Sequence, residues 1–221
     1  LFVFDRCIDD SINVIQSIET FLDVRYIIKE EGTNFSAGLT RDYGVRYFDS
    51  FDYDFILFTD GDCVPSPLVL EEHDCNMNQS NKAIVSCGKR MKENVFGVFE
   101  DDERNIGPWV NGFGFDNIGK VIVSSQLAIN SIFTYSCNLA FNKKAIDLCR
   151  LVNKEISNDE SRVFNSSFDG LWGCEDNFVS YVIFKTSNII LLTSNNSYVE
   201  HYYHEENKKN GTNELSLLLS L

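Results

Sequence analysis

Two acidic residues separated by one glycine are the clearest candidates for chemistry in this sequence. Asp60-Gly61-Asp62 directly follows an apolar segment, 54–59, that has the composition of a buried strand. Carboxylates at i and i+2 of a tight turn can approach one cation, and hard oxygen ligands suit Mg²⁺ or Mn²⁺. A generic acidic turn is one alternative. An EF-hand loop is another, but Pro65 stands where that loop requires Gly.

A second acidic group follows an aromatic, glycine-containing turn. In Trp172-Gly173-Cys174-Glu175-Asp176 the two carboxylates fall in the first turn of an expected helix, where the helix dipole favours negative charge. Simple helix capping would explain them. A transferase, however, needs one carboxylate to accept a proton from an attacking hydroxyl, and an aromatic face to stack on a sugar ring. With an Asp-x-Asp site elsewhere in the chain, we favour this chemical interpretation.

Two of the three histidines, His201 and His204, lie close together after the last expected strand. A neutral imidazole could complete the metal shell that Asp62 begins. A pair of surface histidines is the alternative. His73 falls in an expected helix, and we predict a structural role for it.

The elements that would position these residues alternate strand and helix over the first sixty positions. Such a pattern predicts an α/β fold with an open, mostly parallel twisted sheet flanked by helices. In open α/β sheets, ligands bind outside the carboxyl ends of the strands, which is where the Asp60 turn falls. We expect strands at 1–4, 24–29 and 54–59, and helices from 11 onward and at 35–48.

The rest of the chain continues with mixed elements and no internal repeat or linker. An irregular stretch, 93–117, holds four glycines and Trp109, and we expect it to face a substrate. We therefore predict one domain, 1–221, with a nucleotide-binding half at about 1–90 and an acceptor half at about 91–210. Its expected helices are 65–75, 143–155 and 175–185, and its expected strands are 83–87, 120–124, 136–142 and 188–193.

Composition restricts the partners. The net charge is −14 and there is no Lys/Arg cluster that could follow a phosphate backbone, so we expect no nucleic-acid partner. An anionic ligand would need a divalent cation at its contact point. No apolar run approaches the ~20 residues of a membrane span. The start shows no basic leader region and no Met, consistent with a trimmed N-terminus. The sequence does not determine the cellular compartment, although we favour the cytoplasm. It does not determine the oligomeric state either.

Seven cysteines form no CxxC pair, which argues against a structural zinc site. Their number is odd and their spacing is wide. We expect most of them to be buried as small apolar side chains.

Four motifs, taken in order, resemble the family 2 type of GT-A glycosyltransferase. The likeness extends over roughly residues 1 to 210. The Trp-Gly-x-Glu-Asp segment with a histidine downstream is similar to the galactosyltransferase-like and chondroitin-polymerase-like members. The motifs are Phe35-Ser36-Ala37-Gly38-Leu39-Thr40-Arg41-Asp42-Tyr43-Gly44, the strand and turn at 56–65, Cys137-Asn138-Leu139-Ala140-Phe141, and Gly173-Cys174-Glu175-Asp176-Asn177.

The resemblance implies a role for each candidate residue. Asp60 and Asp62 would hold the metal and diphosphate, with His204 as the late metal ligand. Asp176 would be the general base. Glu175 would hydrogen-bond a sugar, and Arg41 and Asp42 would lie on the helix that holds the nucleotide base. The residues that would contact the donor or acceptor sugar are Trp172, Gly173, Asn138 and Trp109.

The implied activity is inverting transfer of a hexosyl or N-acetylhexosaminyl group from a UDP-sugar to a glycan or other hydroxyl acceptor, with Mn²⁺ or Mg²⁺. A non-catalytic glycan- or nucleotide-binding domain of the same fold is the alternative. A nucleotidyltransferase is a third reading. It would normally carry a Gly-rich basic loop near the first strand, and the sequence shows none there.

Overall fold

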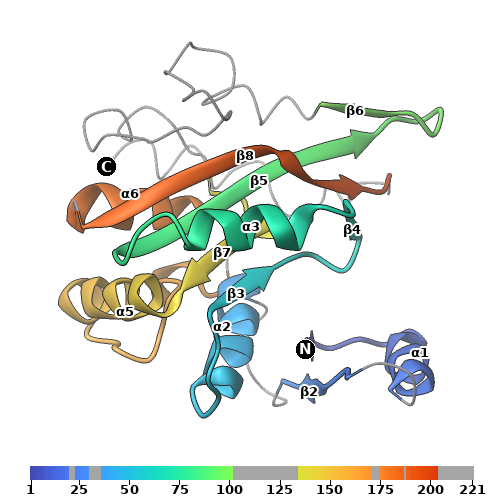
Figure 1. Cartoon of the computed structure of the whole chain (residues 1–221). Coiled ribbons are helices and arrows are strands. Elements are labelled where there is room, and N and C mark those ends of the chain that lie inside the picture. The colour runs from blue at the N-terminus through green and yellow to red at the C-terminus, as the bar shows by residue number, and fades with distance from the viewer. Residues whose placement is uncertain (20–22, 30–35, 102–133, 171–174, 187, 204–221) are drawn as a thin grey trace.

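Two long strands, β5 (Ala83–Glu93) and β8 (Ile189–His201), run side by side through the centre of the computed structural model (Figure 1). The structure describes residues 1–19, 23–29, 36–101, 134–170, 175–186 and 188–203. Within these ranges the main sheet has the order β3-β7-β5-β8-β4, with β6 paired to β5. The other strands are β3 (Phe55–Phe58), β4 (Cys63–Pro65), β6 (Phe99–Asp101) and β7 (Leu139–Asn142).

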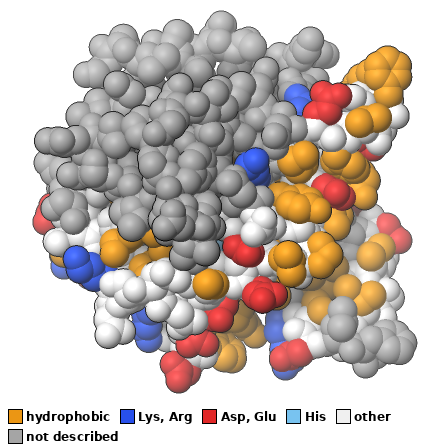
Figure 2. Space-filling model, turned by 45° about the horizontal axis from the view of Figure 1, so that its top comes forward, with side chains coloured by type: hydrophobic (Ala, Val, Ile, Leu, Met, Phe, Trp, Pro, Cys, Tyr) orange, Lys and Arg blue, Asp and Glu red, His pale blue; other side chains and the backbone are white. Residues whose placement is uncertain are grey.

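Strand direction in this sheet is mixed, which corrects the expectation of a mostly parallel sheet. Of its described pairs, only β5–β8 is parallel, while β3–β7, β5–β7, β4–β8 and β5–β6 are antiparallel. The β5–β6 pair is joined by a short hairpin, a connection that only antiparallel strands allow. Gly97 takes φ +76° in that hairpin. The hairpin projects at the upper right of Figure 1, and hydrophobic side chains gather at the same corner in Figure 2.

Helices cover both faces of the main sheet, which explains why its strands read as continuous apolar runs. Met77 from α3 packs on one face with Ile84 and Leu192. Residues of α5 and α6, such as Ile146 and Val179, pack on the other face. The helices are α2 (Ala37–Phe48), α3 (Val69–Met77), α5 (Lys143–Ser157) and α6 (Asn177–Thr186), with short 3₁₀ turns η3 (Ser136–Asn138) and η4 (Ser166–Phe168).

Local sequence signals set the helix ends. Ser36 begins α2, and its side chain accepts a hydrogen bond from the Leu39 amide at 3.0 Å. Asn142 caps α5 in the same way through Ala145, and Asn158, in a left-handed conformation, ends it. The helix expected at 65–75 instead begins at Val69, because the preceding residues pair with β8 as strand β4.

The N-terminal residues form a separate two-stranded parallel sheet. It consists of β1 (Phe2–Phe4) and β2 (Tyr26–Ile28), connected through α1 (Ser11–Ile18). Asp5 ties this unit to α2, because its carboxylate accepts from both Lys29 and Thr40. No helix in the described ranges is long and apolar enough to cross a bilayer.

Strand β8 is much longer than the expected 188–193. It pairs with β5 up to Gly88 and Ser194, and then resumes at Lys89 opposite Tyr198. The three residues between Ser194 and Tyr198 form a bulge. Because these residues are polar, the sequence predicted a tail at this position. One of them, Ser197, is buried, and its hydroxyl lies 3.1 Å from His73 Nε2. The second half of β8 then brings His201 into the sheet opposite Cys63.

Candidate functional site

The side chain of Arg41 joins two acidic residues that lie far apart in the sequence. Its Nη1 donates to Glu175 Oε1 at 2.7 Å, and its Nη2 donates to Asp60 Oδ1 at 2.9 Å. Arg41 comes from α2, Asp60 from the turn after β3, and Glu175 from the turn before α6. Buried or half-buried charge-assisted bonds of this kind are strong and directional. One guanidinium therefore fixes the relative positions of both acidic motifs found in the sequence.

Gly38, one turn before Arg41 on α2, makes room for this arrangement. A Cβ atom at this position would lie 2.9 Å from Phe164 Cβ and 3.3 Å from Glu175 Cγ. Both distances are shorter than ordinary van der Waals contact. The glycine in the Phe-Ser-Ala-Gly motif thus allows Glu175 to approach the helix that carries Arg41.

Asp176 is half-buried beside this cluster. Its Oδ2 accepts from the Ser136 amide at 3.0 Å and from the Ser136 hydroxyl at 3.1 Å. Burial and the neighbouring Glu175 carboxylate raise the pKa of Asp176, while Arg41 and the Ser136 hydrogen bonds oppose that rise. The result is a positioned carboxylate with strengthened basicity.

Asp62 and His201 meet across the β4–β8 pair. His201 Nε2 lies 3.2 Å from Asp62 Oδ2, and the Asp62 carbonyl accepts from the Tyr202 amide at 3.0 Å. Ligand atoms of Asp62, Cys63 and His201 all lie within 4.8 Å of one another. A carboxylate and an imidazole at this spacing are suitable ligands for a divalent cation.

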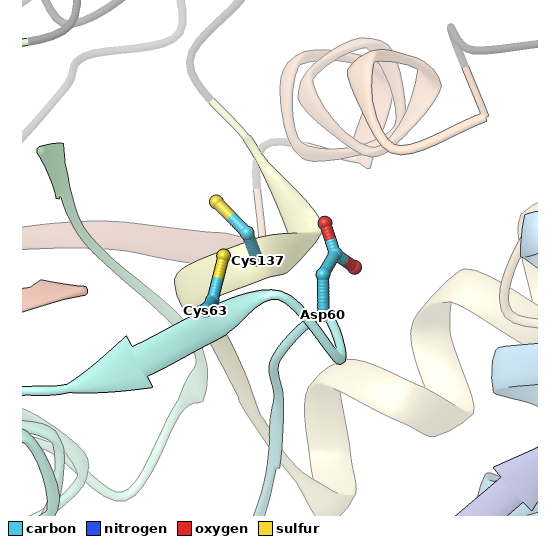
Figure 3. A group of neighbouring side chains, drawn as sticks. All are labelled: Asp60, Cys63 and Cys137. Atoms are coloured by element: carbon cyan, nitrogen blue, oxygen red, sulfur yellow. The ribbon is translucent and has the colours of Figure 1, made fainter. Parts of the chain in front are cut away.

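A second group lies on the other side of Cys63. The Cys63 and Cys137 sulfur atoms and an Asp60 carboxylate oxygen lie within 4.8 Å of one another (Figure 3). Hydrogen bonding to Cys137, followed by burial, holds the pKa of the Cys63 thiol far above its usual range.

Two residues assigned to the site by resemblance are instead buried beneath it. Asp42 accepts from the Arg162 guanidinium at 2.5 Å and from the Val163 amide at 2.8 Å. It is fully buried, so a nucleotide base does not reach it in this arrangement. Asn138 is equally buried, with its Oδ1 2.8 Å from His73 Nε2. Gly88 leaves room for the Asn138 side chain, because a Cβ at Gly88 would lie 2.0 Å from Asn138 Nδ2.

Of the remaining candidates, His204, Trp172, Gly173 and Trp109 lie outside the described residues. Gly61 is exposed, and a Cβ there would have open space around it. Sequence reasoning weighed His201 but preferred His204, and it missed Cys137 and Ser136. The sequence offered one indication of these residues, the position of Cys137-Asn138 at the start of a strand segment. Their partners, Asp176 for Ser136 and Cys63 for Cys137, come from distant segments of the chain.

Comparisons with known proteins place this fold in a known class. No protein-family model and no curated protein matches the sequence. Among solved structures, S. aureus TarS (residues 1–349), crystallised in complex with UDP-GlcNAc, is similar with a TM-score of 0.59 and 15% identity, over 92% of this chain and 49% of that one. GalNAc-T7 with UDP, GalNAc and Mn²⁺ is similar with a TM-score of 0.55 and 11% identity, over 92% and 38%.

Both neighbours are glycosyltransferases of the GT-A type, and the chain has the GT-A fold. It spans half or less of the length of each of these two structures. At such low identity the likeness concerns the fold, and the activity has to be argued from the side chains.

Proposed function

We propose that this chain is the catalytic domain of a glycosyltransferase that uses a nucleotide-sugar donor. The observation that carries the proposal is the Arg41 bridge between Asp60 and Glu175. The bridge supports the proposal because Asp60, in the turn that would bind the cation, and Glu175, the neighbour of the proposed base Asp176, are held together within a GT-A fold. A transfer reaction needs both groups at one place, because the leaving diphosphate and the attacking hydroxyl flank the same anomeric carbon.

The donor we propose is a UDP-sugar, held with Mn²⁺ or Mg²⁺. Asp62, His201 and Asp60 supply oxygen and nitrogen ligands that fit such an ion, and His204 is a further candidate. When bound, the cation would neutralise charge on the departing diphosphate. The two similar structures, one in complex with UDP-GlcNAc and the other with UDP, GalNAc and Mn²⁺, support this donor class.

Asp176 would accept the proton of the acceptor hydroxyl. Ser136 orients its carboxylate through two hydrogen bonds, and the raised pKa brings it closer to the value an effective base needs. A single displacement with this base inverts the anomeric configuration, through a transition state that resembles an oxocarbenium ion. Glu175 is bound to Arg41, so we assign it to orientation of the donor or acceptor sugar.

The remaining roles follow the sequence motifs. Trp172, Gly173 and Trp109 would contact sugars, and Asn138 would act by holding η3, which carries Ser136. We propose a single domain in which the nucleotide occupies the N-terminal half and the acceptor the C-terminal half. A non-catalytic binding domain of the same fold would also bind UDP, but it would not need a basic carboxylate at Asp176.

Calorimetry with UDP tests the donor part of this proposal. We expect UDP to bind in the presence of Mn²⁺, with little binding in its absence. Asp62→Ala should abolish the Mn²⁺-dependent component while leaving the melting temperature unchanged. Asp52→Ala is the matched control, because Asp52 is an exposed carboxylate in the loop before β3. Equal Mn²⁺-dependent affinity in wild type and Asp62→Ala would remove Asp62 from the site.

A further inference from the structure

Two buried thiols lie beside the acidic turn, and the proposed transfer reaction uses neither of them. Cys63 is 8% exposed at the start of β4, and Cys137 is 2% exposed in η3. The three-residue group with Asp60 has all its ligand atoms within 4.8 Å of one another. In Figure 3 the two sulfur atoms lie next to each other, and Asp60 stands on the adjoining turn.

This ligand set suits a different class of metal from the one that a diphosphate needs. Thiolate sulfur favours Zn²⁺ and other thiophilic ions, whereas Mg²⁺ and Mn²⁺ prefer oxygen. In a tetrahedral site with bonds of about 2.0–2.3 Å, ligand atoms lie about 3.3–3.8 Å apart. The spacing of Cys63, Cys137 and Asp60 is compatible with closure to that geometry by small side-chain movements. A fourth position stays available for water.

Charge also favours a cation at this place. Zn²⁺ with two thiolates and one carboxylate has a net charge of −1, because binding releases one proton from each thiol to solvent. The Arg41 guanidinium, 2.9 Å from Asp60 Oδ1, would therefore face an anionic complex and would not be repelled by it.

We propose that Cys63, Cys137 and Asp60 form a second metal site, which takes a thiophilic divalent cation such as Zn²⁺. Asp60 is also one of the ligands proposed above for the nucleotide-sugar site, so occupancy of the site formed by Cys63, Cys137 and Asp60 removes a carboxylate from it. Zn²⁺ therefore acts as an inhibitor of Mn²⁺-dependent nucleotide binding. This inhibitory consequence rests on the proposed function, whereas the metal site itself does not.

Cobalt absorption tests the site directly, because Co²⁺ bound to thiolate gives a near-ultraviolet charge-transfer band. Reduced wild-type protein should show this band at one equivalent of Co²⁺, and Zn²⁺ should displace it. Cys63→Ala and Cys137→Ala should each weaken Co²⁺ binding at least ~10-fold and reduce the band. Cys149→Ala is the matched control, since Cys149 is an equally buried cysteine in α5. Absence of a band in wild type, or a full band in the double variant, overturns the proposal.

A histidine variant separates this site from its neighbour. Cys63 also belongs to the group with Asp62 and His201, so a thiophilic ion could bind there instead. Our proposal requires the band to persist in full in His201→Ala and to be reduced in Cys137→Ala. The reverse pattern would place the ion on His201 and contradict the assignment.

Wild-type protein provides a test that does not depend on variants folding. Zn²⁺ should slow alkylation of Cys63 and Cys137, mapped by mass spectrometry, while the exposed Cys75 reacts at an unchanged rate. Protection of Cys75 alone would refute the site. Zn²⁺ should also weaken UDP binding in Mn²⁺ at least ~10-fold in wild type and not in Cys137→Ala. Absence of Mn²⁺-dependent UDP binding by wild-type protein before any Zn²⁺ is added would count against the proposed function, while the cobalt band still decides the metal site.

Discussion

His201 Nε2 lies 3.2 Å from Asp62 Oδ2, although the two residues lie far apart in the sequence. The sheet fixes this relationship, since Cys63 pairs with His201 in the antiparallel β4–β8 ladder. Backbone pairing continues one step further, where the Tyr202 amide donates to the Asp62 carbonyl. The histidine is therefore held at the acidic turn by strand pairing.

This geometry predicts that His201 contributes to cation binding. We expect His201→Ala to weaken Mn²⁺-dependent UDP binding at least ~10-fold, because the ion loses an imidazole ligand or the group that orients Asp62. His204→Ala, measured by the same calorimetry, tests the ligand favoured by the family resemblance. Full affinity in His201→Ala together with loss in His204→Ala would assign the metal to the later histidine alone.

A pair of glycines on one helix tests the packing beneath the Arg41 bridge. Gly38→Ala places a methyl group against Phe164 and Glu175, so we expect a loss of about 1–3 kcal/mol in the free energy of unfolding and weaker UDP binding. Gly44→Ala is the matched control, because its Cβ would meet its nearest atom at an ordinary 3.5 Å. It should stabilise α2 by up to ~1 kcal/mol. Urea unfolding measures the stability of both variants. Equal stability of Gly38→Ala and Gly44→Ala would contradict the close approach of Glu175 to α2.

Ser136 should tune the base through its hydroxyl. That hydrogen bond favours the charged form of Asp176, so Ser136→Ala should raise the pKa of Asp176 further. Only the deprotonated carboxylate accepts a proton. The acid limb of the kcat/KM profile should therefore move to higher pH, with the plateau largely kept. Ser136→Thr retains the hydroxyl and should restore the original limb. An unmoved limb in Ser136→Ala would mean that another group sets it.

A substitution at Asp42 tests whether this residue stabilises the fold or contacts the nucleotide base. Asp42→Asn breaks a buried ion pair with Arg162, and we expect a loss of about 3 kcal/mol in the free energy of unfolding. The value lies at the low end of the range because Arg162 keeps Asp169 as a partner. The half-exposed pair of Asp49 with Arg150 is the control, and Asp49→Asn should cost less than ~1 kcal/mol. Unchanged stability combined with weaker UDP binding would instead make Asp42 a contact of the base.

The sequence predicted the fold class well where elements carry strong local signals. The alternating strands and helices before Asp60 and the capped helix after Asn142 are all present. It failed on β8, because the polar residues 194–197 resemble a loop. Their polarity is satisfied by partners such as His73 and Glu72 that only the tertiary structure supplies. Short β4 has no signal of its own, since its existence depends on the second half of β8.

The candidate site divides in the same way. Asp60, Asp62 and Asp176 could be named as candidates because their residue types and motif positions are informative, and their roles stay predictions. The roles of Asp42 and Asn138 could not be read from motifs, because burial and partners decide them. Ser136 and Cys137 became candidates only when η3 was seen to lie between Asp176 and the acidic turn.

Asp176→Asn tests the central claim most directly. Asn keeps the shape of the side chain and caps helices about as well as Asp, but it cannot accept the proton. Release of UDP from a panel of UDP-sugars, with Mn²⁺ and a hydroxyl acceptor, should be measured together with donor affinity and melting temperature on the same preparation. We expect donor affinity and stability to persist while the transfer rate falls at least ~10²-fold. Transfer at the wild-type rate would contradict Asp176 as the base, and no transfer by the wild-type protein with any donor would contradict the glycosyltransferase function.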